Sequence, residues 1–477
     1  MRQGSDELTA RVNPYSRAER TEAFPAVIRS GRLPLSRPER LGLIGFAIAI
    51  VAFGAIVEMR SAFLKHRRTD LDVYLRAAWA VRTGHDIYAI ADEHDWHYHY
   101  PPLFAILITP LADPPPGEDR HGALPFAASV AIWYTLNIIL VACAVHLLAR
   151  AFEDTSRFVR DCVGPPGSRG WWSLRIIPVL TCLPGIGATL ARSEANLPVL
   201  LLLCAMIAQI MRGRFLLAGI FLAGSISLKV FPAFLIVYPL FRRDLRMLVG
   251  CGIGLAVFLY LIPSLVFGPR QTVAYWHEWN EVLAAPALGP GVDKSRFTEL
   301  IGITSTDSQS FQTIIHNTIH FDEVIHLDRG DRSNYLARGI RIAHWTMGAL
   351  LTLATLAAGG WKRSANALDE GLLTGCLLVV MILLSPVCHL HYFALLVPLV
   401  MSLLALAWHT VGDASLGKRW RWLFAANAAG TALPHLPICQ ILKDLGLATY
   451  VTLALWGCGV FELWRGRRSA SSSSLSI

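Results

Sequence analysis

The sequence predicts an all-α integral membrane protein with about 10–12 transmembrane helices and two long polar loops on one side of the membrane. Hydrophobic residues make up 54% of the 477 positions, and charged residues make up only 16%. Soluble globular domains carry about 25% charged residues, so the missing charge is informative. The apolar residues are also gathered into long blocks that arginine-bearing segments separate. These features exclude a soluble multidomain enzyme, a disulfide-linked secreted domain, a disordered chain and a coiled coil.

The positive charge of the chain points to a membrane and not to nucleic acid. The formal net charge is +9, and most of the basic residues are arginines that flank apolar blocks. Such flanking charges set the orientation of membrane helices, so we expect no nucleic-acid partner. The nine cysteines form no Cys-x-x-Cys pair and fall mostly inside apolar blocks, which is typical of small buried side chains.

The apolar blocks define the elements in order. Residues 1–40 are polar and predict a cytoplasmic tail, and residues 41–57 predict an uncleaved first span, because a secretory signal would begin closer to the first residue. Most blocks are long enough to cross a hydrocarbon layer of about 30 Å at about 1.5 Å per residue. The membrane domain, 41–464, ends before the serine-rich residues 465–477, which predict a disordered cytoplasmic end. The further blocks are 124–149, 174–191, 196–211, 215–241, 247–267, 340–359, 371–386, 391–409, 422–439 and 447–464.

Basic residues between the blocks predict which ends face the cytoplasm. The block 215–241 has basic residues at both ends, so it must leave the cytoplasmic side and return to it. We therefore predict a hairpin of two short helices that turns near Ser227, Leu228 and Lys229, which gives about twelve helical segments; one long tilted helix is the alternative. The cytoplasmic clusters are Arg150/Arg157/Arg160/Arg169, Arg212/Arg214, Arg242/Arg243/Arg246, Lys362/Arg363, Lys418/Arg419/Arg421 and Arg465/Arg467/Arg468.

This orientation leaves two long polar segments, 59–123 and 268–339, on the extracytoplasmic side. The first segment places Asp70 and Asp72 shortly after the first span. A carboxyl group at the membrane surface has partly apolar surroundings, which raise its pKa toward that of a general base. The alternative is structural, because Asp70 before Leu71 is also suited to cap a short amphipathic helix.

Five motifs follow one another between about residues 45 and 410. They are Asp70-x-Asp72-Val73-Tyr74 with Gly84, Tyr88, Tyr100-Pro101-Pro102 and Pro110-Leu111; Asn196 after Ser193-Glu194-Ala195; Lys229-x-x-Pro232; Ser308-Gln309-Ser310-Phe311; and Ser385-Pro386 with His391-Tyr392. In this order they resemble glycosyltransferase family 87, whose members are polyprenol-phosphate-dependent mannosyltransferases and relatives with the GT-C membrane fold. The resemblance implies a GT-C type fold and metal-independent transfer of a hexose, most often mannose.

Three stretches depart from the family's pattern. This chain has Ser193-Glu194 where members often carry Gly-Gln, and Ser308 where they often carry asparagine before Gln-Ser. It also has residues 388–392, Cys-His-Leu-His-Tyr, where members often show Ser-Trp-x-His-His. These departures imply a different donor or acceptor preference.

Sugar transfer from a lipid phosphate needs one base and several cations. The leaving phosphate is already a good anion, so no general acid is required, whereas the acceptor proton needs a base and the growing charge needs positive partners. By the resemblance, Asp70 is the base and Asp72 the fallback. Three residues of the same motifs, Asp72, Tyr74 and Tyr100, are assigned to substrate binding.

Lys229 is the candidate cation that the sequence itself singles out. It is the only charged residue between Phe215 and Phe241, and a lone ammonium in an apolar hairpin needs an anion or a water-filled cavity. The alternative is snorkelling of its side chain to the interface. Arg192 is predicted on the same face, where Glu194 or Asn196 holds it or a sugar hydroxyl.

Two further residues are assigned from the resemblance. His391 follows Ser385-Pro386 at the entrance of a span and contacts the donor phosphate, with His389 as its weaker neighbour; a plain interfacial histidine is the alternative. Gln309 is a polar contact to substrate.

The acidic and histidine residues of the first loop do not predict a metal site. Their spacing, His-x-x-His-x-His with flanking aspartates, fits no tetrahedral ligand set. The resemblance also implies metal-independent chemistry, so we expect neither a metal nor another cofactor. The residues concerned are Asp92, His94, Asp95, His97 and His99.

We therefore expect a multi-pass hexosyltransferase of the bacterial inner membrane with its active site on the extracytoplasmic side. It would move the sugar, with inversion, from a polyprenyl-phosphate donor to a glycan or glycolipid acceptor, and its remaining partner is the lipid bilayer. The rival interpretation is a lipid or solute transporter with Lys229 in the translocation path. The two halves show no matching pair of interrupted helices and the polar residues gather on one side, which favours the enzyme.

Overall fold

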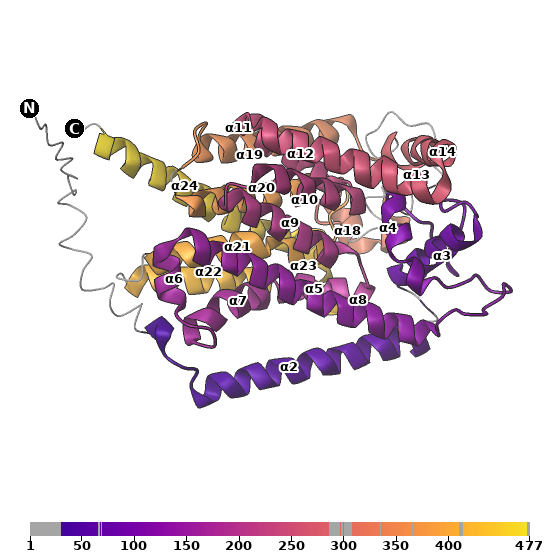
Figure 1. The fold of residues 1–477 in the computed structure, drawn as a ribbon, viewed down its shortest axis with the longest axis horizontal. Helices are drawn as coiled ribbons and strands as arrows, with labels where there is room; N and C mark the ends of the chain where they lie inside the picture. Colours follow the sequence, from indigo (N-terminus) through magenta and orange to yellow (C-terminus); the bar gives the residue numbers. More distant parts are fainter. Residues whose placement is uncertain are drawn as a thin grey trace, which may run out of the picture.

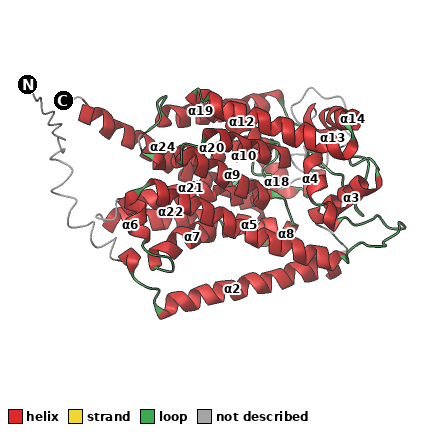
Figure 2. Ribbon diagram, viewed as in Figure 1, coloured by secondary structure: helices red, strands yellow, loops and turns green. Residues whose placement is uncertain are grey.

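Seven helices of the computed structural model are long and apolar enough to cross a membrane. The structure describes residues 30–64, 67, 69–285, 296, 299, 308–333, 335–364, 366–409 and 414–474, without the side chains of 409, 414–418 and 469–474. Within these ranges every regular element is helical (Figure 2). The seven are α2 with its π-helical extension η2 (Arg37–Glu58, Met59–Leu64), α5 (Phe126–Thr155), α12 with η5 and α13 (Leu245–Leu255, Ala256–Leu261, Ile262–Phe267), α19 (Arg338–Gly359), α20 (Ala367–Leu384), η8 with α21 (Leu390–Leu396, Val397–His409) and α24 (Leu447–Ser474).

Shorter apolar helices complete the membrane bundle. A bent pair, α7 (Arg169–Thr181) and α8 (Leu183–Arg192), turns by 64° and makes an eighth candidate span. Pro184 in the first turn of α8 removes a backbone donor at this break. The seven helices, the bent pair and three shorter apolar helices agree with the predicted fold of about 10–12 helices. The three are α9 (Asn196–Met211), α10 (Phe215–Leu228) and η4 with α11 (Phe231–Ile236, Val237–Arg242). Two further helices are the short α6 (Arg157–Val163) and α22 (Ala414–Ala432).

Both ends of the membrane domain extend beyond the apolar blocks. Helix α2 begins at Arg37, because Ser36 and Glu39 form a capping box that starts the helix before the apolar run. It continues through η2 to Leu64, so the first polar loop starts later than residue 59. Helix α24 runs to Ser474, into the segment 465–477 that the composition predicts as a disordered end.

The predicted hairpin of residues 215–241 is present. Helix α10 ends at Leu228, Lys229 is extended, and η4 and α11 lead the chain back. Arg242 at the end of α11 contacts Glu370 at the start of α20, with 2.8 Å between Nη2 and Oε1. The next residue of α20, Gly371, lies beside Met211, the last residue of α9, just before α10 begins. The segment therefore leaves one end of the bundle and returns to it.

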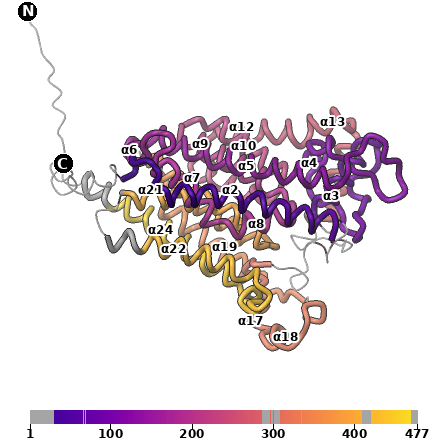
Figure 3. The backbone as a smooth tube through the Cα atoms, turned by 90° about the horizontal axis from the view of Figure 1, so that it is seen from below, coloured from indigo at the N-terminus to yellow at the C-terminus, as the bar shows by residue number. Residues whose placement is uncertain are grey.

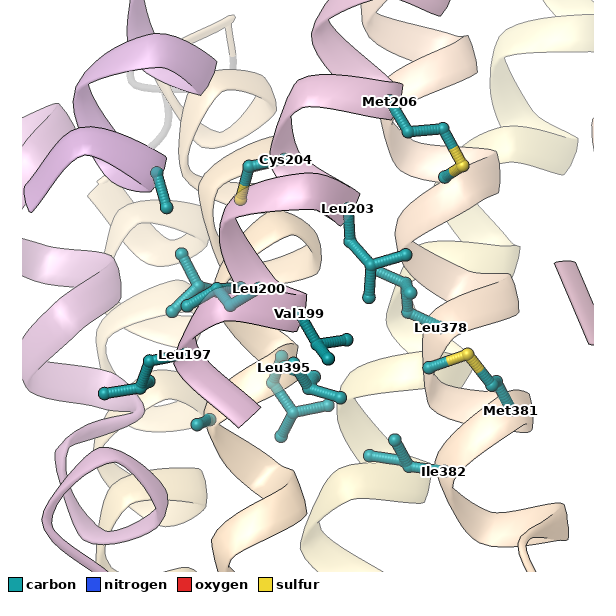
Figure 4. Close-up of a cluster of buried hydrophobic side chains, with 14 of the residues drawn as sticks. Leu197, Val199, Leu200, Leu203, Cys204, Met206, Leu378, Met381, Ile382 and Leu395 are labelled. Atoms are coloured by element: carbon teal, nitrogen blue, oxygen red, sulfur yellow. The ribbon is translucent and has the colours of Figure 1, made fainter. Parts of the chain in front are cut away.

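Helix α9 is the centre of the apolar core. It packs against α5, α10, α20 and η8, and its side chains are buried on almost every face. Figure 4 shows α9 side chains interlocked with those of α20 and η8. A helix held on all sides fixes the residues at its start, which are Glu194, Ala195 and Asn196. The labelled core residues are Leu197, Val199, Leu200, Leu203, Cys204, Met206, Leu378, Met381, Ile382 and Leu395.

Glycines allow α10 and α12 to pack with their backbones in contact. A Cβ atom on Gly219 would overlap the carbonyl oxygen of Met247, and one on Gly250 would overlap the carbonyl oxygen of Leu216. Small residues at such crossings are a common device of membrane helices, because they let backbones approach closely. This contact holds the hairpin against the long helix α12.

We expect Gly250→Ala to lower the free energy of unfolding by about 1–3 kcal/mol, because the added methyl group must push two backbones apart. The control is Gly252→Ala on the same helix, where a Cβ would meet nothing within 4 Å. Thermal unfolding of the purified proteins in lipid measures both. Equal melting temperatures for the two variants would contradict the close helix crossing.

The two polar loops gather at one end of the bundle, which we name the loop end. There α3 (Asp70–Thr83), α4 (Pro102–Leu107) and α14 (Pro269–Trp279) lie together, far from α6 and the end of α24 at the tail end (Figure 1). Figure 3 shows α17 (Phe311–Ile319) and α18 (Phe321–His326) projecting to one side. Parts of the predicted loop 268–339 lie outside the described residues. The remaining short elements are η3 (Thr109–Leu111), η6 (Asn280–Ala284), η7 (Arg329–Asp331), η9 (Leu433–His435), η10 (Pro437–Cys439) and α23 (Gln440–Asp444).

Candidate active site

Asp70 is the first residue of α3 and lies at the junction of the loop and the bundle. Thr69 before it is extended and is the N-cap, so Asp70 occupies the first helical turn, where a negative charge is favoured. Its side chain is partly exposed, whereas the following residues Leu71 to Ala78 are buried against the loop elements. Its carboxyl group meets the carboxyl group of Glu194 through a hydrogen bond. Asp70 therefore faces the bundle, and capping is not its side chain's role.

Glu194 is the centre of a cluster of side chains that we name the hub. The other members are Asp70, Tyr74, Tyr100, Asn196, Lys229 and His391. Glu194 lies between α8 and α9, directly after Ser193, whose left-handed φ of 60° turns the chain. Its Oε2 atom accepts hydrogen bonds from Lys229 Nζ at 2.7 Å, Tyr100 Oη at 3.1 Å and Tyr74 Oη at 3.3 Å. The side chain is buried, so these donors replace the water that an ionised carboxylate requires.

Lys229 reaches the hub from the break between α10 and η4. Its side chain is buried, and its Nζ atom also donates to Asn196 Oδ1 at 2.9 Å. The rings of Tyr100 and Tyr392 lie 5.2 Å and 4.9 Å from the ammonium, within the range of cation–π attraction. The lysine is therefore held inside the protein and does not snorkel to the interface.

His391 closes the hub from the start of η8. Its Nε2 atom lies 3.3 Å from Glu194 Oε1, and its carbonyl oxygen accepts from Thr189 Oγ1 at 3.0 Å and Asn196 Nδ2 at 3.4 Å. His389 lies beside it, with 5.1 Å between the ring centroids. The histidine is fully buried and contacts the same acidic group as Lys229, which a merely interfacial histidine would not do.

Basic side chains lie beside the partly exposed Asp70, at the side of the hub that we name its opening. Arg192 is exposed at the end of α8, and its charge acts on both Asp70 and His389. Lys443 in α23 is close enough for Arg192 to lower its pKa; burial and Arg329 contribute more, and the pKa falls to about 8. The chain thus gathers positive charge beside Asp70 from elements that are far apart in the sequence.

Gln309 lies at this opening and connects two elements there. Its side-chain Nε2 atom donates to the backbone carbonyl oxygen of Lys443 at 2.7 Å, and its backbone carbonyl oxygen accepts from Thr449 Oγ1 at 2.7 Å. Its side-chain oxygen is buried without a hydrogen-bond partner among the described residues. An unsatisfied buried acceptor beside cations is suited to a hydroxyl donor of a ligand.

Asp72 points away from the hub, because residues two apart on a helix differ by about 200° in direction. Its Oδ1 atom lies 3.4 Å from Arg67 Nη1 and 3.6 Å from Arg76 Nε. Burial raises the pKa of Asp72 to about 6, although both arginines act to lower it. The structure therefore separates the two aspartates: Asp70 belongs to the hub, and Asp72 to an ion network within the first loop.

The histidines of the first loop join it to the second loop. His97 Nδ1 and His99 Nε2 each lie 3.1 Å from a carboxylate oxygen of Glu299. Within the described ranges, no three histidine, cysteine, aspartate or glutamate side chains converge as metal ligands. These side chains therefore hold the two loops together.

The electrostatics of the two hub carboxyl groups run in opposite directions. Burial, followed by the negative charge of Glu194, raises the pKa of Asp70 well above its usual range, although Arg192 and Lys229 oppose the shift. Burial also acts to raise the pKa of Glu194, but the charges of Lys229 and His391 hold it well below its usual range. Burial likewise raises the pKa of Tyr74 and Tyr100, so both phenols remain hydrogen-bond donors.

The structure thus brings together Asp70, Tyr74, Tyr100, Asn196, Lys229 and His391, with Arg192 and Gln309 at the opening, and leaves out Asp72. The central role of Glu194 is new, as are Lys443 and Tyr392. The sequence holds one signal for Glu194. A buried lysine such as Lys229 requires an anion, and Glu194 is an acidic residue two positions before Asn196 of the second motif.

The sequence matches one known protein family. Residues 98–386, more than half of the chain, match glycosyltransferase family 87. The segment includes Glu194, Lys229 and Gln309, whereas Asp70 precedes it by 28 positions and His391 follows it by five.

Named relatives come from mycobacteria. A polyprenol-phosphate-mannose-dependent alpha-(1-2)-phosphatidylinositol mannoside mannosyltransferase of Mycobacterium tuberculosis is 26% identical over 72% of this chain and 71% of its own length. The protein of the same description from Mycolicibacterium smegmatis is 24% identical over 77% and 74%. An alpha-(1->3)-arabinofuranosyltransferase of Mycobacterium tuberculosis is 26% identical over 47% and 48%. With the family matched over most of the bundle and a helical membrane architecture around the hub, the chain belongs to glycosyltransferase family 87 and is an integral membrane protein of the GT-C type.

Proposed function

We propose that this membrane glycosyltransferase moves a hexose, which we take to be mannose, from a polyprenyl phosphate to a glycan or glycolipid acceptor, with Asp70 as the general base. The observation that carries the proposal is the hub itself. One carboxyl group at its opening faces buried Lys229 and His391, with Arg192 close by. One base beside several cations is what transfer from a lipid phosphate requires.

The chemistry is a single displacement. Asp70 takes the proton of the acceptor hydroxyl, whose oxygen attacks the anomeric carbon and breaks the bond from that carbon to the phosphate oxygen. Attack opposite the leaving group inverts the anomeric configuration. Lys229 donates two of its N–H bonds to Glu194 and Asn196 and would donate the third to the phosphate, with Arg192 as the second cation and His391 as a neighbouring imidazole.

An apolar cavity supports a lipid-linked donor. It holds about 290 Å³ and is lined by residues of α17, α19 and α24, including Phe311, Met347 and Leu453. Thr449, which also lines it, donates to Gln309 at the opening of the hub. A hydrocarbon chain in this cavity would leave its phosphate next to the cations around Lys443.

The proposed location is the inner membrane of a bacterium, with the loop end on the extracytoplasmic side. Arg242, Arg363 and Arg467 pair with carboxylate or carbonyl oxygens at the tail end. Basic residues favour the cytoplasmic ends of membrane helices, which supports this orientation.

The test is transfer of radiolabelled sugar by the purified protein in lipid vesicles. Polyprenyl-phosphate mannose is offered with a glycolipid acceptor, and a matched reaction offers a polyprenyl-phosphate pentofuranose, because one relative is named for arabinofuranose. Transfer of mannose supports the proposal, and transfer of the pentose alone would overturn the hexose. Donor that crosses the bilayer intact without transfer would instead identify a transporter.

We expect kcat/KM for the donor to fall as the pH is lowered through the raised pKa of Asp70. The sign follows from the requirement for an ionised base: a raised pKa leaves Asp70 protonated at pH values where an ordinary aspartate is ionised. The acid limb therefore lies well above the usual aspartate value of 3.8. The residual transfer by Asp70→Asn should lack this limb, and an unchanged limb in that variant would assign it to another group.

A further inference from the structure

The carboxyl groups of Asp70 and Glu194 contact each other, and a hydrogen bond between two carboxyl groups needs a proton. We propose that the two side chains share one proton, and that the ammonium of Lys229 decides which of them carries it. The inference rests on the proposed function and deepens it, because it makes Glu194 the positioning residue of the base.

Before a donor binds, the proton belongs to Asp70. Glu194 Oε2 receives three hydrogen bonds, one of them charged and only 2.7 Å long, and each stabilises the ionised form. Among the described residues no comparable donor reaches Asp70, and its neighbour Glu194 already carries the negative charge. The pKa shifts agree with this geometry, since the pKa of Asp70 is raised and that of Glu194 is lowered.

All charged and titratable groups that face the pair act on the same balance. The cations Lys229 and Arg192 favour ionised carboxylates, and Lys229 donates directly to Glu194. Among the described residues, these groups come from every element around the hub: Tyr74 of α3, Tyr100 of the first loop, Arg192 of α8, Lys229 of the hairpin, and His389, His391 and Tyr392 at the start of η8.

Donor binding moves the proton. A phosphate that takes up Lys229 weakens the attraction between the ammonium and Glu194, so Glu194 gains affinity for a proton. The proton then passes from the Asp70 carboxyl oxygen to the Glu194 carboxyl oxygen, and Asp70 becomes the carboxylate that the reaction needs. The base is thus ionised when the donor is present.

The reaction is balanced in protons. Asp70 takes the acceptor proton while the new bond to the anomeric carbon forms and the old bond to phosphate breaks. When the polyprenyl phosphate leaves Lys229, the ammonium returns to Glu194, which gives up its proton. One proton is released per transfer, and it balances the extra negative charge of the phosphate monoester product.

Kinetics over a pH series test the proposal. The acid limb of kcat/KM for the donor reports the empty enzyme, and that of kcat reports the donor complex. With the acceptor saturating, we expect the limb of kcat to lie about one pH unit or more below that of kcat/KM, which is a tenfold shift or more in acidity. In Glu194→Gln the two limbs should coincide. Coincident limbs in the wild type, or an undiminished separation in Glu194→Gln, would overturn the proposal.

Infrared difference spectra give a readout that needs no transfer. The band of a protonated carboxyl group should be lost both in Asp70→Asn and in Glu194→Gln, because either change leaves no pair to share a proton. Glu299→Gln is the control, since the histidines of the first loop overcome burial and lower the pKa of Glu299 to about 2, so it has no such band to lose. A band that persists in Glu194→Gln would show that burial alone protonates Asp70, and the shared proton would be disproved.

Polyprenyl phosphate separates the proton pair from the proposed reaction. Its addition should add a second band to that of the wild type, because Asp70 and Glu194 are both protonated in the product complex. An unchanged spectrum with bound polyprenyl phosphate would contradict the role of Lys229. Should no donor support transfer, the two variant spectra still decide whether the proton is shared, so the failure of the function and of the pair remain distinguishable.

Discussion

Replacing Asp70 by asparagine is expected to lower kcat by about 10²–10⁴-fold, the usual contribution of a general base. Asparagine keeps the size of the side chain but cannot accept the acceptor proton. Donor binding should remain, because Lys229 and His391 are untouched. Radiolabel transfer and donor binding by the same purified protein measure the two effects separately.

Two other aspartates of the first loop serve as comparisons. Asp95→Asn is the control, since Asp95 is exposed and its positive φ of 61° suits asparagine; its transfer should equal that of the wild type. Asp72→Asn tests the other candidate base, and we expect the loss of transfer to be smaller and to accompany a lower melting temperature, because Asp72 pairs with Arg67 and Arg76. A loss in Asp72→Asn alone would reassign the base.

Removing the charge of Lys229 is expected to lower the free energy of unfolding by about 3–5 kcal/mol, as breaking one partner of a buried ion pair does. In Lys229→Met, Glu194 stays buried without its closest cation, at a site where only 3% of the Lys229 surface was exposed. The double variant Lys229→Met/Glu194→Gln removes both charges and should recover much of the loss. Thermal unfolding in lipid measures all three proteins.

A surface ion pair provides the matched control for the Lys229 and Glu194 variants. Arg212 and Asp154 also lie 2.8 Å apart, but both are partly exposed at the tail end. Breaking this pair with Arg212→Gln should cost at most about 1 kcal/mol. If the double variant were no more stable than Lys229→Met, the buried pair would not be the source of the loss.

The helices and the hairpin follow from the sequence because their causes are local. Apolar length marks the spans, and the basic residues around Arg212 and Arg242 require the turn at Lys229. The bend at Pro184 was not predicted, because the apolar block 174–191 continues through it. Hydropathy records that a segment prefers lipid but does not record the direction of its axis.

The hub could be predicted only in part, because its members meet through tertiary packing. The motif gave Asp70, and the lone charge in an apolar hairpin gave Lys229. Nothing near Glu194 in the sequence indicates that Tyr74, 120 positions earlier, donates to it. Lys443 was missed for the same reason, since it arrives from α23 near the other end of the chain.

The shortness of the hairpin sets the depth at which the sugar would react. Helix α10 has 14 residues and is about 21 Å long, whereas its neighbour segment Leu245–Phe267 has 23 residues and is about 35 Å long. Both segments start at the tail end, so a hydrocarbon layer of about 30 Å that begins there would extend about 9 Å beyond Lys229. If donor and acceptor are both lipid-anchored, as the proposed function has it, they would reach this depth by lateral diffusion in the plane of the bilayer. Their search for the site would then be two-dimensional, whereas an acceptor dissolved in water would have to enter the apolar layer.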